Sequence, residues 1–241
     1  MKRIILALTL LLPSFAFAAG GGMKLMDAGT DLSDYASLQN GAKLYVNYCA
    51  GCHSLEYMRY NRIGQDLHLT DEQVKENLMF SGGKIGDTMT IAMRADDAEK
   101  WFGKAPPDLS VIARSRGVDW LYTYLMTFYV DESRSTGMNN LVFKDVGMPH
   151  VLWELQGLKK AVHHDDGHGH ETVELEYIDS ADAAKEAEYR RTVRDLVNFL
   201  DYVGEPAKMQ RYDLGWKVIA FLFFFLIVAF IMKKDFWRDV H

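Results

Sequence analysis

The chain has 241 residues, of which 49% are hydrophobic and 25% charged. These proportions are ordinary for a globular protein and exclude collagen, a coiled coil and bulk disorder. A net charge of −6 and a pI near 5.7 argue against a nucleic-acid binder, which normally carries a basic face. Two cysteines are too few for a disulfide-stabilised scaffold.

The N-terminus, residues 1–18, has the pattern of a secretory signal peptide. Two basic residues precede an apolar run at 4–12, and Pro13 leads to a small-residue cleavage site that ends at Ala18. An uncleaved anchor is the alternative, but the run is short and Pro13 interrupts it. We therefore expect cleavage after Ala18 and export of the rest of the chain.

A C-x-x-C-H motif follows a stretch with helical spacing at residues 38–48. It consists of Cys49, Cys52 and His53. Two thiols about one helical turn apart can add to the two vinyl groups of one porphyrin, and the adjacent histidine then becomes the proximal iron ligand. A zinc site would need two more cysteine or histidine ligands, a thioredoxin-like pair would need a βαβ setting, and a disulfide here would be strained. The motif therefore predicts one covalently attached haem c.

Beyond the motif, the sequence predicts mainly helices joined by long loops. A capping box at residues 70–73 indicates the start of a short helix, and an apolar, aromatic stretch at 120–129 indicates a helix that lines a core. Glycine and proline predict loops at 103–110, 137–140 and 147–149. Since no strand-rich region stands out, the expected fold class is mainly α, with a cytochrome c-like haem domain and long loops.

An acidic stretch at residues 163–188 contains nine carboxylates, four histidines and one lysine. Its composition predicts a solvated surface loop, with loose metal binding by the histidines as the less favoured alternative. A helix is expected from about residue 182, because apolar residues form one stripe at 193–203 before Gly204 and Pro206 end it.

The C-terminus has the composition of a membrane span. Residues 218–232 are fifteen apolar residues without interruption, and flanking aromatic residues extend the expected transmembrane helix to 214–232. A buried core helix is less favoured because the run has no polar face. Two lysines follow directly and mark residues 233–241 as a cytoplasmic tail.

This topology places residues 19–213 on the side of the membrane opposite the cytoplasm, which the bacterial resemblance described below implies is the periplasmic side of an inner membrane. That domain holds 21 lysine and arginine residues and 31 aspartate and glutamate residues. Because its balance is −10, we expect it to attract a basic partner.

The second axial ligand of a low-spin haem is a methionine or a histidine, and the chain has twelve methionines. Met148 is favoured because Gly147 lets the backbone approach a flat ring and Pro149 restricts Met148 to an extended conformation. On spacing alone, the other open candidates are Met138, Met93 and Met89.

Four further segments stand out at residues 101–110, 136–140, 147–153 and 233–237. Their sequences are WFGKAPPDLS, TGMNN, GMPHVLW and KKDFW. Together with the motif segment at 41–62, they resemble the bacterial members of the cytochrome c1 family, the haem subunits of the cytochrome bc1 complex. The resemblance covers nearly the whole mature chain.

This resemblance implies roles for single residues. Met148, in its Gly-Met-Pro segment, would be the distal ligand, and the segment that contains Pro107 would run beside the haem. Arg116, the second arginine of an I-x-R-x-R pattern, would bind a haem propionate, with a plain surface arginine as the alternative. The acidic stretch at 163–188 matches no motif of the family.

The resemblance also implies a function and partners. The chain would be an electron-transfer subunit and not an enzyme on its own, passing single electrons from a Rieske iron–sulfur protein to a soluble cytochrome c. Its other expected partners are a cytochrome b subunit and a second copy of the complex. One alternative is a stand-alone membrane-tethered cytochrome c that feeds a terminal oxidase. Another is a haem enzyme with an open distal site, which the Met148 segment argues against.

Overall fold

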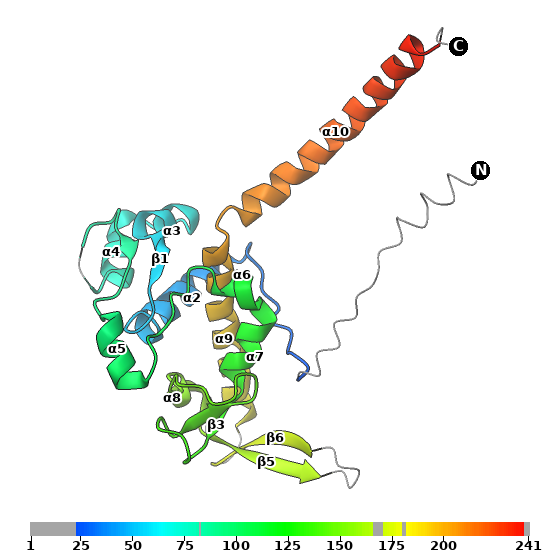
Figure 1. Cartoon of the computed structure of the whole chain (residues 1–241). Helices are drawn as coiled ribbons and strands as arrows, with labels where there is room; N and C mark the ends of the chain where they lie inside the picture. The colour runs from blue at the N-terminus through cyan, green and yellow to red at the C-terminus, as the bar shows by residue number, and fades with distance from the viewer. Residues whose placement is uncertain (1–22, 82, 166–170, 180–181, 239–241) are drawn as a thin grey trace.

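The computed structural model describes residues 23–81, 83–165, 171–179 and 182–238 (Figure 1). The expected signal peptide, residues 1–18, lies outside these ranges. Most of the regular structure is helical, which confirms the mainly α fold class.

Two helices, α2 (Tyr35–Tyr48) and α9 (Ala183–Gly204), pack against each other at the centre of the core. Asp34 caps α2 by accepting a hydrogen bond from the Ser37 N–H at 3.0 Å. Asp182 caps α9 by accepting from the N–H groups of Ala184 and Lys185. The apolar stripe of the sequence is buried along α9. The start and the end of the domain therefore form one platform, and the C-x-x-C-H motif follows α2 directly.

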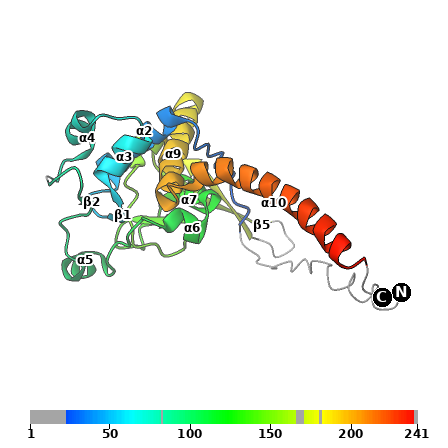
Figure 2. The same cartoon turned by 90° about the horizontal axis from the view of Figure 1, so that it is seen from above.

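Three more helices pack on α9. They are α6 (Ile112–Arg116), α7 (Val118–Met126) and α8 (Trp153–Gln156). Seen from above, α9 lies between α2 and the α6–α7 pair (Figure 2). Because α6 and α7 bring the aromatic segment 120–126 onto this platform, the predicted core helix is confirmed up to Met126.

The helices α2 and α9 approach so closely at Gly41 that no side chain fits there. A Cβ atom at this position would lie 2.1 Å from the Asp195 carbonyl oxygen and 2.6 Å from the Phe199 Cβ. We expect Gly41→Ala to lower the free energy of unfolding by about 3 kcal/mol or more, because the backbone of α9 must move. Thermal unfolding should show a Tm that is about 6–12 °C lower.

The matched control is Gly86→Ala, since no other atom lies within 4 Å of a Cβ added there. Its Tm should stay close to that of the parent protein. Equal Tm values for the two alanine variants would contradict the close packing of α2 on α9.

A second group of elements follows the motif. In chain order these are β1 (Leu55–Arg59), α3 (Tyr60–Asp66), α4 (Asp71–Leu78), β2 (Thr88–Met89) and α5 (Ala95–Phe102). Strands β1 and β2 pair antiparallel. The predicted capping box is confirmed at α4, where the Thr70 hydroxyl accepts from the Gln73 N–H and the Gln73 side chain accepts from the Thr70 N–H.

A four-stranded sheet corrects two predictions of the sequence. Its order is β4-β3-β5-β6, and the strands are β3 (Phe128–Val130), β4 (Met138–Asn140), β5 (Lys159–Asp165) and β6 (Glu171–Tyr177). The loop predicted at 137–140 is wrong because β4 pairs antiparallel with β3. The helix predicted at 120–129 ends at Met126 for the same reason.

The solvated loop predicted for residues 163–188 is also wrong over most of its described length. Strands β5 and β6 form a hairpin there, and α9 begins at Ala183. Residues 171–177 alternate polar with apolar or aromatic side chains at Val173, Leu175 and Tyr177, which is the period of a strand. The high acid content hid this alternation, although the carboxylates at Glu174 and Glu176 are exposed as expected.

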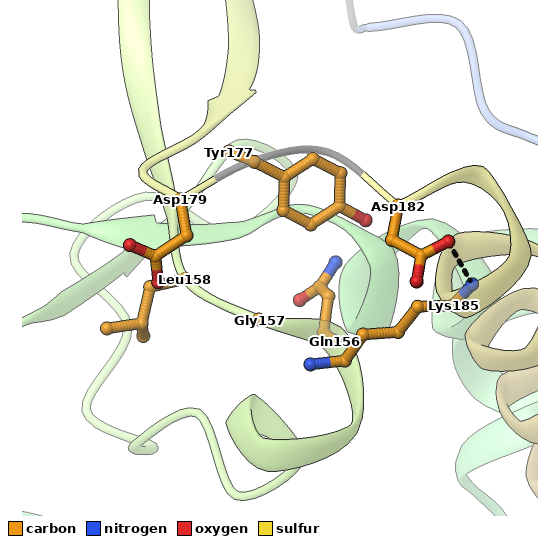
Figure 3. A pocket seen from close by; sticks show the side chains of 7 residues that line it. All are labelled: Gln156, Gly157, Leu158, Tyr177, Asp179, Asp182 and Lys185. Atoms are coloured by element: carbon orange, nitrogen blue, oxygen red, sulfur yellow. Dashed lines mark hydrogen bonds between the residues drawn. The ribbon is translucent and has the colours of Figure 1, made fainter.

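A small cavity of about 70 Å³ lies where β6 leads towards α9 (Figure 3). It is lined by Gln156, Gly157, Leu158, Tyr177, Asp179, Asp182 and Lys185. The Asp182 carboxylate accepts a hydrogen bond from the Lys185 N–H, and this bond is part of the α9 cap. None of these residues belongs to the site expected from the sequence, so the cavity is a feature of the sheet–helix junction.

The last helix, α10 (Lys208–Phe236), extends away from the rest of the chain (Figures 1 and 2). The mean hydropathy of its most apolar 18-residue window is 2.5, and the large apolar side chains from Leu214 to Met232 are exposed. The helix contains the expected span at 214–232 and is a candidate membrane helix by length and composition. At its base, the Lys208 ammonium contacts both oxygens of Asp201 at 2.9 Å, which ties α10 to the end of α9.

Candidate haem-binding site

The C-x-x-C-H motif is wound into a tight turn directly after α2. The N–H of Cys49 donates to the Tyr45 carbonyl at 2.8 Å, and the N–H groups of Cys52 and His53 donate to the Cys49 carbonyl at 3.0 and 2.9 Å. Both cysteines are free thiols. Burial raises the pKa of Cys49 to about 12, with a contribution from Cys52, so this thiol is neutral, as the thioether that it would form is.

The His53 ring is held in one orientation and one tautomer. Its Nδ1 lies 2.7 Å from the Pro107 carbonyl oxygen. Because a carbonyl only accepts hydrogen bonds, Nδ1 carries the proton and Nε2 keeps its lone pair for a metal. Burial lowers the pKa of His53, and this is opposed by the Pro107 carbonyl and by Asp108. A neutral imidazole with a free Nε2 is the form that binds iron.

The segment around Pro107 is tied to the residues that follow the motif. The Leu109 N–H donates to the Ser54 carbonyl at 2.9 Å, and the Asp108 carboxylate accepts from the Glu56 N–H at 2.9 Å. Two stretches more than 50 positions apart therefore form one unit around His53. Pro107 acts in it through its backbone oxygen, a role that the sequence did not reveal.

Met148 lies in a loop and packs on a small apolar cluster. The cluster consists of Phe128, Met138 and Val146, and Met148 is half-buried against it. The Tyr124 hydroxyl donates a hydrogen bond to the Met148 sulfur at 3.3 Å. The flanking Gly147 lies near α5, where an added Cβ would meet the Phe102 carbonyl oxygen at 3.7 Å.

The other methionines considered as ligands are placed differently. Met138 is buried in β4 beside Met148, whereas Met89 is buried in β2 and pairs with Leu55. Met93 lies half-buried in the segment between β2 and α5. None of these three sulfurs shares a hydrogen bond like that between Tyr124 and Met148 within the described residues.

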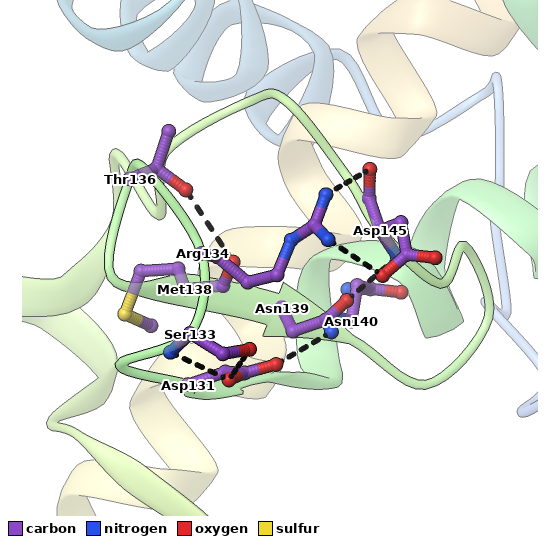
Figure 4. Close-up of polar contacts among 8 residues, drawn as sticks. All are labelled: Asp131, Ser133, Arg134, Thr136, Met138, Asn139, Asn140 and Asp145. Carbon is purple, nitrogen blue, oxygen red and sulfur yellow. Dashed lines mark hydrogen bonds and ion pairs between the residues drawn. The ribbon is translucent and has the colours of Figure 1, made fainter.

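The loop that leads to Met148 is organised by Asn139 and Asn140 (Figure 4). The Asn139 side chain accepts from the Asp145 N–H at 2.8 Å and donates to the Asp131 carboxylate at 2.8 Å. The Asn140 side chain donates to the Tyr124 carbonyl at 2.7 Å. An ion pair of 2.9 Å between Arg134 and Asp145 closes the loop, which links the TGMNN segment to the end of α7.

Arg116 is exposed at the end of α6. Its guanidinium carbon lies 5.1 Å from the centre of the Trp120 ring. It forms no ion pair within the described parts of the chain, so its charge is available to an anion such as a propionate. The sequence did not single out Tyr124, although the four-residue spacing of Arg116, Trp120 and Tyr124 is a signal that could have identified it. It also did not single out the Tyr45 hydroxyl, which donates to the His53 carbonyl.

The donor set fits a c-type haem. Two free thiols, an imidazole with one fixed proton and a thioether are the groups that attach such a haem and ligate its iron. Among the described residues, no group of three or more histidine, cysteine, aspartate or glutamate side chains lies together as a metal site would require. A mainly α domain with this donor set, followed by an apolar helix, defines the class of membrane-anchored c-type cytochromes.

Comparisons with known proteins give the family. The family model of the "Cytochrome C1 family" matches residues 27–240. The chain is 48% identical to cytochrome c1 of Allochromatium vinosum, with 100% of both chains covered. It is 46% identical to a protein of Nitrosomonas europaea named ammonia monooxygenase gamma subunit, with 100% and 99% covered. It is 27% identical to the mitochondrial cytochrome c1 haem protein of Neurospora crassa, over 85% of this chain and 62% of that one.

The chain therefore belongs to the cytochrome c1 family. Members of this family are haem-bearing electron-transfer subunits of the respiratory cytochrome bc1 complex and are anchored in the membrane. The family model extends over α10, so the candidate span is part of what the relatives share.

Proposed function

We propose that this chain relays single electrons from a Rieske iron–sulfur protein to a soluble cytochrome c. It would do so beside a cytochrome b subunit in a dimeric bc1 complex, with one haem c attached through Cys49 and Cys52. The observation that carries the proposal is the likeness to cytochrome c1 over the full chain. The contact of His53 with the Pro107 carbonyl and the hydrogen bond from Tyr124 to the Met148 sulfur support it.

The two proposed axial ligands explain why the site would transfer electrons and bind no substrate. His53 and Met148 would both hold the haem iron, so no ligand position would remain for a reactant. When bound, the haem iron supplies a one-electron couple between its ferric and ferrous states. A thioether ligand favours the ferrous state and raises the potential, which suits acceptance from a Rieske centre. The Pro107 carbonyl holds His53 in the tautomer that would ligate the iron, and the exposed Arg116 would pair with a propionate.

The rest of the chain would determine on which side of the membrane the domain lies and how fast it meets a soluble partner. We propose that residues 1–18 are removed, that residues 19–213 lie in the periplasm, that 214–232 cross the bacterial inner membrane and that 233–241 remain in the cytoplasm. The helix α10 would raise the effective concentration of the domain beside its membrane partners. The balance of −10 over 19–213 would speed the encounter with a basic soluble cytochrome.

Purification from native membranes in a mild detergent tests this function. We expect b-type haem to copurify with this chain, and the preparation to reduce soluble cytochrome c with quinol in an antimycin-sensitive reaction. A c-type haem that elutes alone and without this activity would instead favour the stand-alone tethered carrier. Copurification with an ammonia monooxygenase would instead favour the assembly in the name of the Nitrosomonas europaea relative.

A further inference from the structure

A column of side chains runs along α6, α7 and β3 at a spacing of four residues. The guanidinium of Arg116 lies over Trp120, and the Trp120 and Tyr124 rings are stacked with centres 5.1 Å apart and planes at 8°. The Tyr124 ring then meets Phe128 edge to face at 5.1 Å. Because Trp120 and Phe128 contact the Tyr124 ring from two sides, they fix the position of the ring and of its hydroxyl oxygen.

The backbone of Tyr124 is restrained as well. Its carbonyl accepts the hydrogen bond from the side chain of Asn140, the last residue of β4 before the loop that leads to Met148. Phe128, the next member of the column, belongs to the small apolar cluster against which Met148 packs. The positions of the hydroxyl and of the sulfur are therefore determined by the same set of contacts.

The hydroxyl of Tyr124 donates to the Met148 sulfur at 3.3 Å. A thioether sulfur has two lone pairs and accepts hydrogen bonds weakly. If one lone pair receives the phenolic hydrogen, the other is left for the iron. The hydrogen bond also withdraws electron density from the sulfur, and the ferric state loses more from a poorer donor than the ferrous state does.

We propose that Tyr124 is a positioning residue for the distal ligand, whose hydroxyl orients the Met148 sulfur and raises the haem potential. This inference rests on the proposed ligation by Met148. Tyr124, although it is not itself a ligand, would then increase the driving force for electron transfer to this chain. Trp120 and Phe128 contribute by holding the ring, and Asn140 contributes by holding the end of α7.

The test is Tyr124→Phe in the full-length, haem-loaded protein. Phenylalanine keeps the ring, its stacking on Trp120 and its edge-to-face contact with Phe128. Only the hydroxyl is removed. We expect the ferrous-to-ferric ratio at a fixed electrode potential to fall by up to about tenfold, which is about 59 mV for a one-electron couple. The near-infrared charge-transfer band of methionine-ligated ferric haem should remain, because the sulfur stays on the iron.

Tyr189→Phe is the matched control. The Tyr189 hydroxyl is buried and donates to the Leu125 carbonyl at 2.7 Å, beside the same helix but away from the sulfur. This variant should lose stability and keep the parent potential. An unchanged potential in Tyr124→Phe, loss of its near-infrared band, or an equal shift in Tyr189→Phe would each overturn the inference. Retention of the band in Met148→Leu would instead show that the proposed ligation itself is wrong.

Discussion

Replacing Met148 by leucine is expected to lower the midpoint potential of the haem by on the order of 0.2 V, since axial ligands set haem potentials over a range of about 0.8 V. Leucine has nearly the volume of methionine, so the packing on Phe128 and Val146 should survive while the sulfur is lost. A potentiometric titration followed by the absorbance of the reduced haem measures the shift. Quinol-to-cytochrome-c activity should fall with it, because a haem of low potential no longer accepts electrons from a Rieske centre.

Met138→Leu is the control for this experiment, because Met138 is buried in the same cluster and is itself a ligand candidate from the sequence. Its potential should match that of the parent protein. If the midpoint potential falls in Met138→Leu and stays at the parental value in Met148→Leu, the ligand has been assigned to the wrong methionine. A change in neither variant would point to Met89 or Met93.

Replacing both Cys49 and Cys52 by alanine is expected to abolish covalent attachment of the haem. Neither alanine can form a thioether, and the turn held by the Cys49 carbonyl does not depend on the side chains. The single variants should each keep one thioether, with a shifted absorption maximum of the alkaline pyridine complex. Haem-dependent peroxidase staining after denaturing electrophoresis measures the result, because only covalently held haem stays with the denatured chain.

The control for haem attachment is Met148→Leu, which should keep full staining, because an axial ligand contributes nothing to the covalent bonds. Staining of the double alanine variant at parental intensity would contradict attachment through the C-x-x-C-H motif. Because Cys49 is buried, Cys49→Ala leaves a small cavity that lowers the free energy of unfolding by about 1 kcal/mol. Circular dichroism of each variant should therefore be recorded to confirm that the helices form.

Several helices could be predicted from sequence patterns of a few neighbouring residues. The capping box at Thr70 and Gln73 predicted the start of α4, and the stripe at 193–203 together with Gly204 predicted α9 and its end. The apolar run predicted α10 because a helix is the way a single segment satisfies its own backbone in lipid. The spacing of Cys49, Cys52 and His53 likewise predicted a one-turn arrangement, which the hydrogen bonds to the Cys49 carbonyl show.

The sheet could not be predicted in the same way. Strand β3 is three residues long and lies between β4 and β5, and its parallel contact with β5 joins Val130 to Lys160. A segment so short has no period of its own, so its partners decide its conformation. The alternation in residues 171–177 was visible, but its acid content resembles that of a solvated loop.

The sequence alone thus predicted the caps and the apolar span and carries the proposed attachment chemistry, since each depends on side chains within about one helical turn or on a single continuous run. Only the tertiary structure decided which groups contact the proposed ligands. Pro107 reaches His53 across 54 positions, and Tyr124 reaches Met148 across 24. Such contacts depend on how loops close and how helices such as α2 and α9 pack at Gly41, and no short stretch of sequence contains that information.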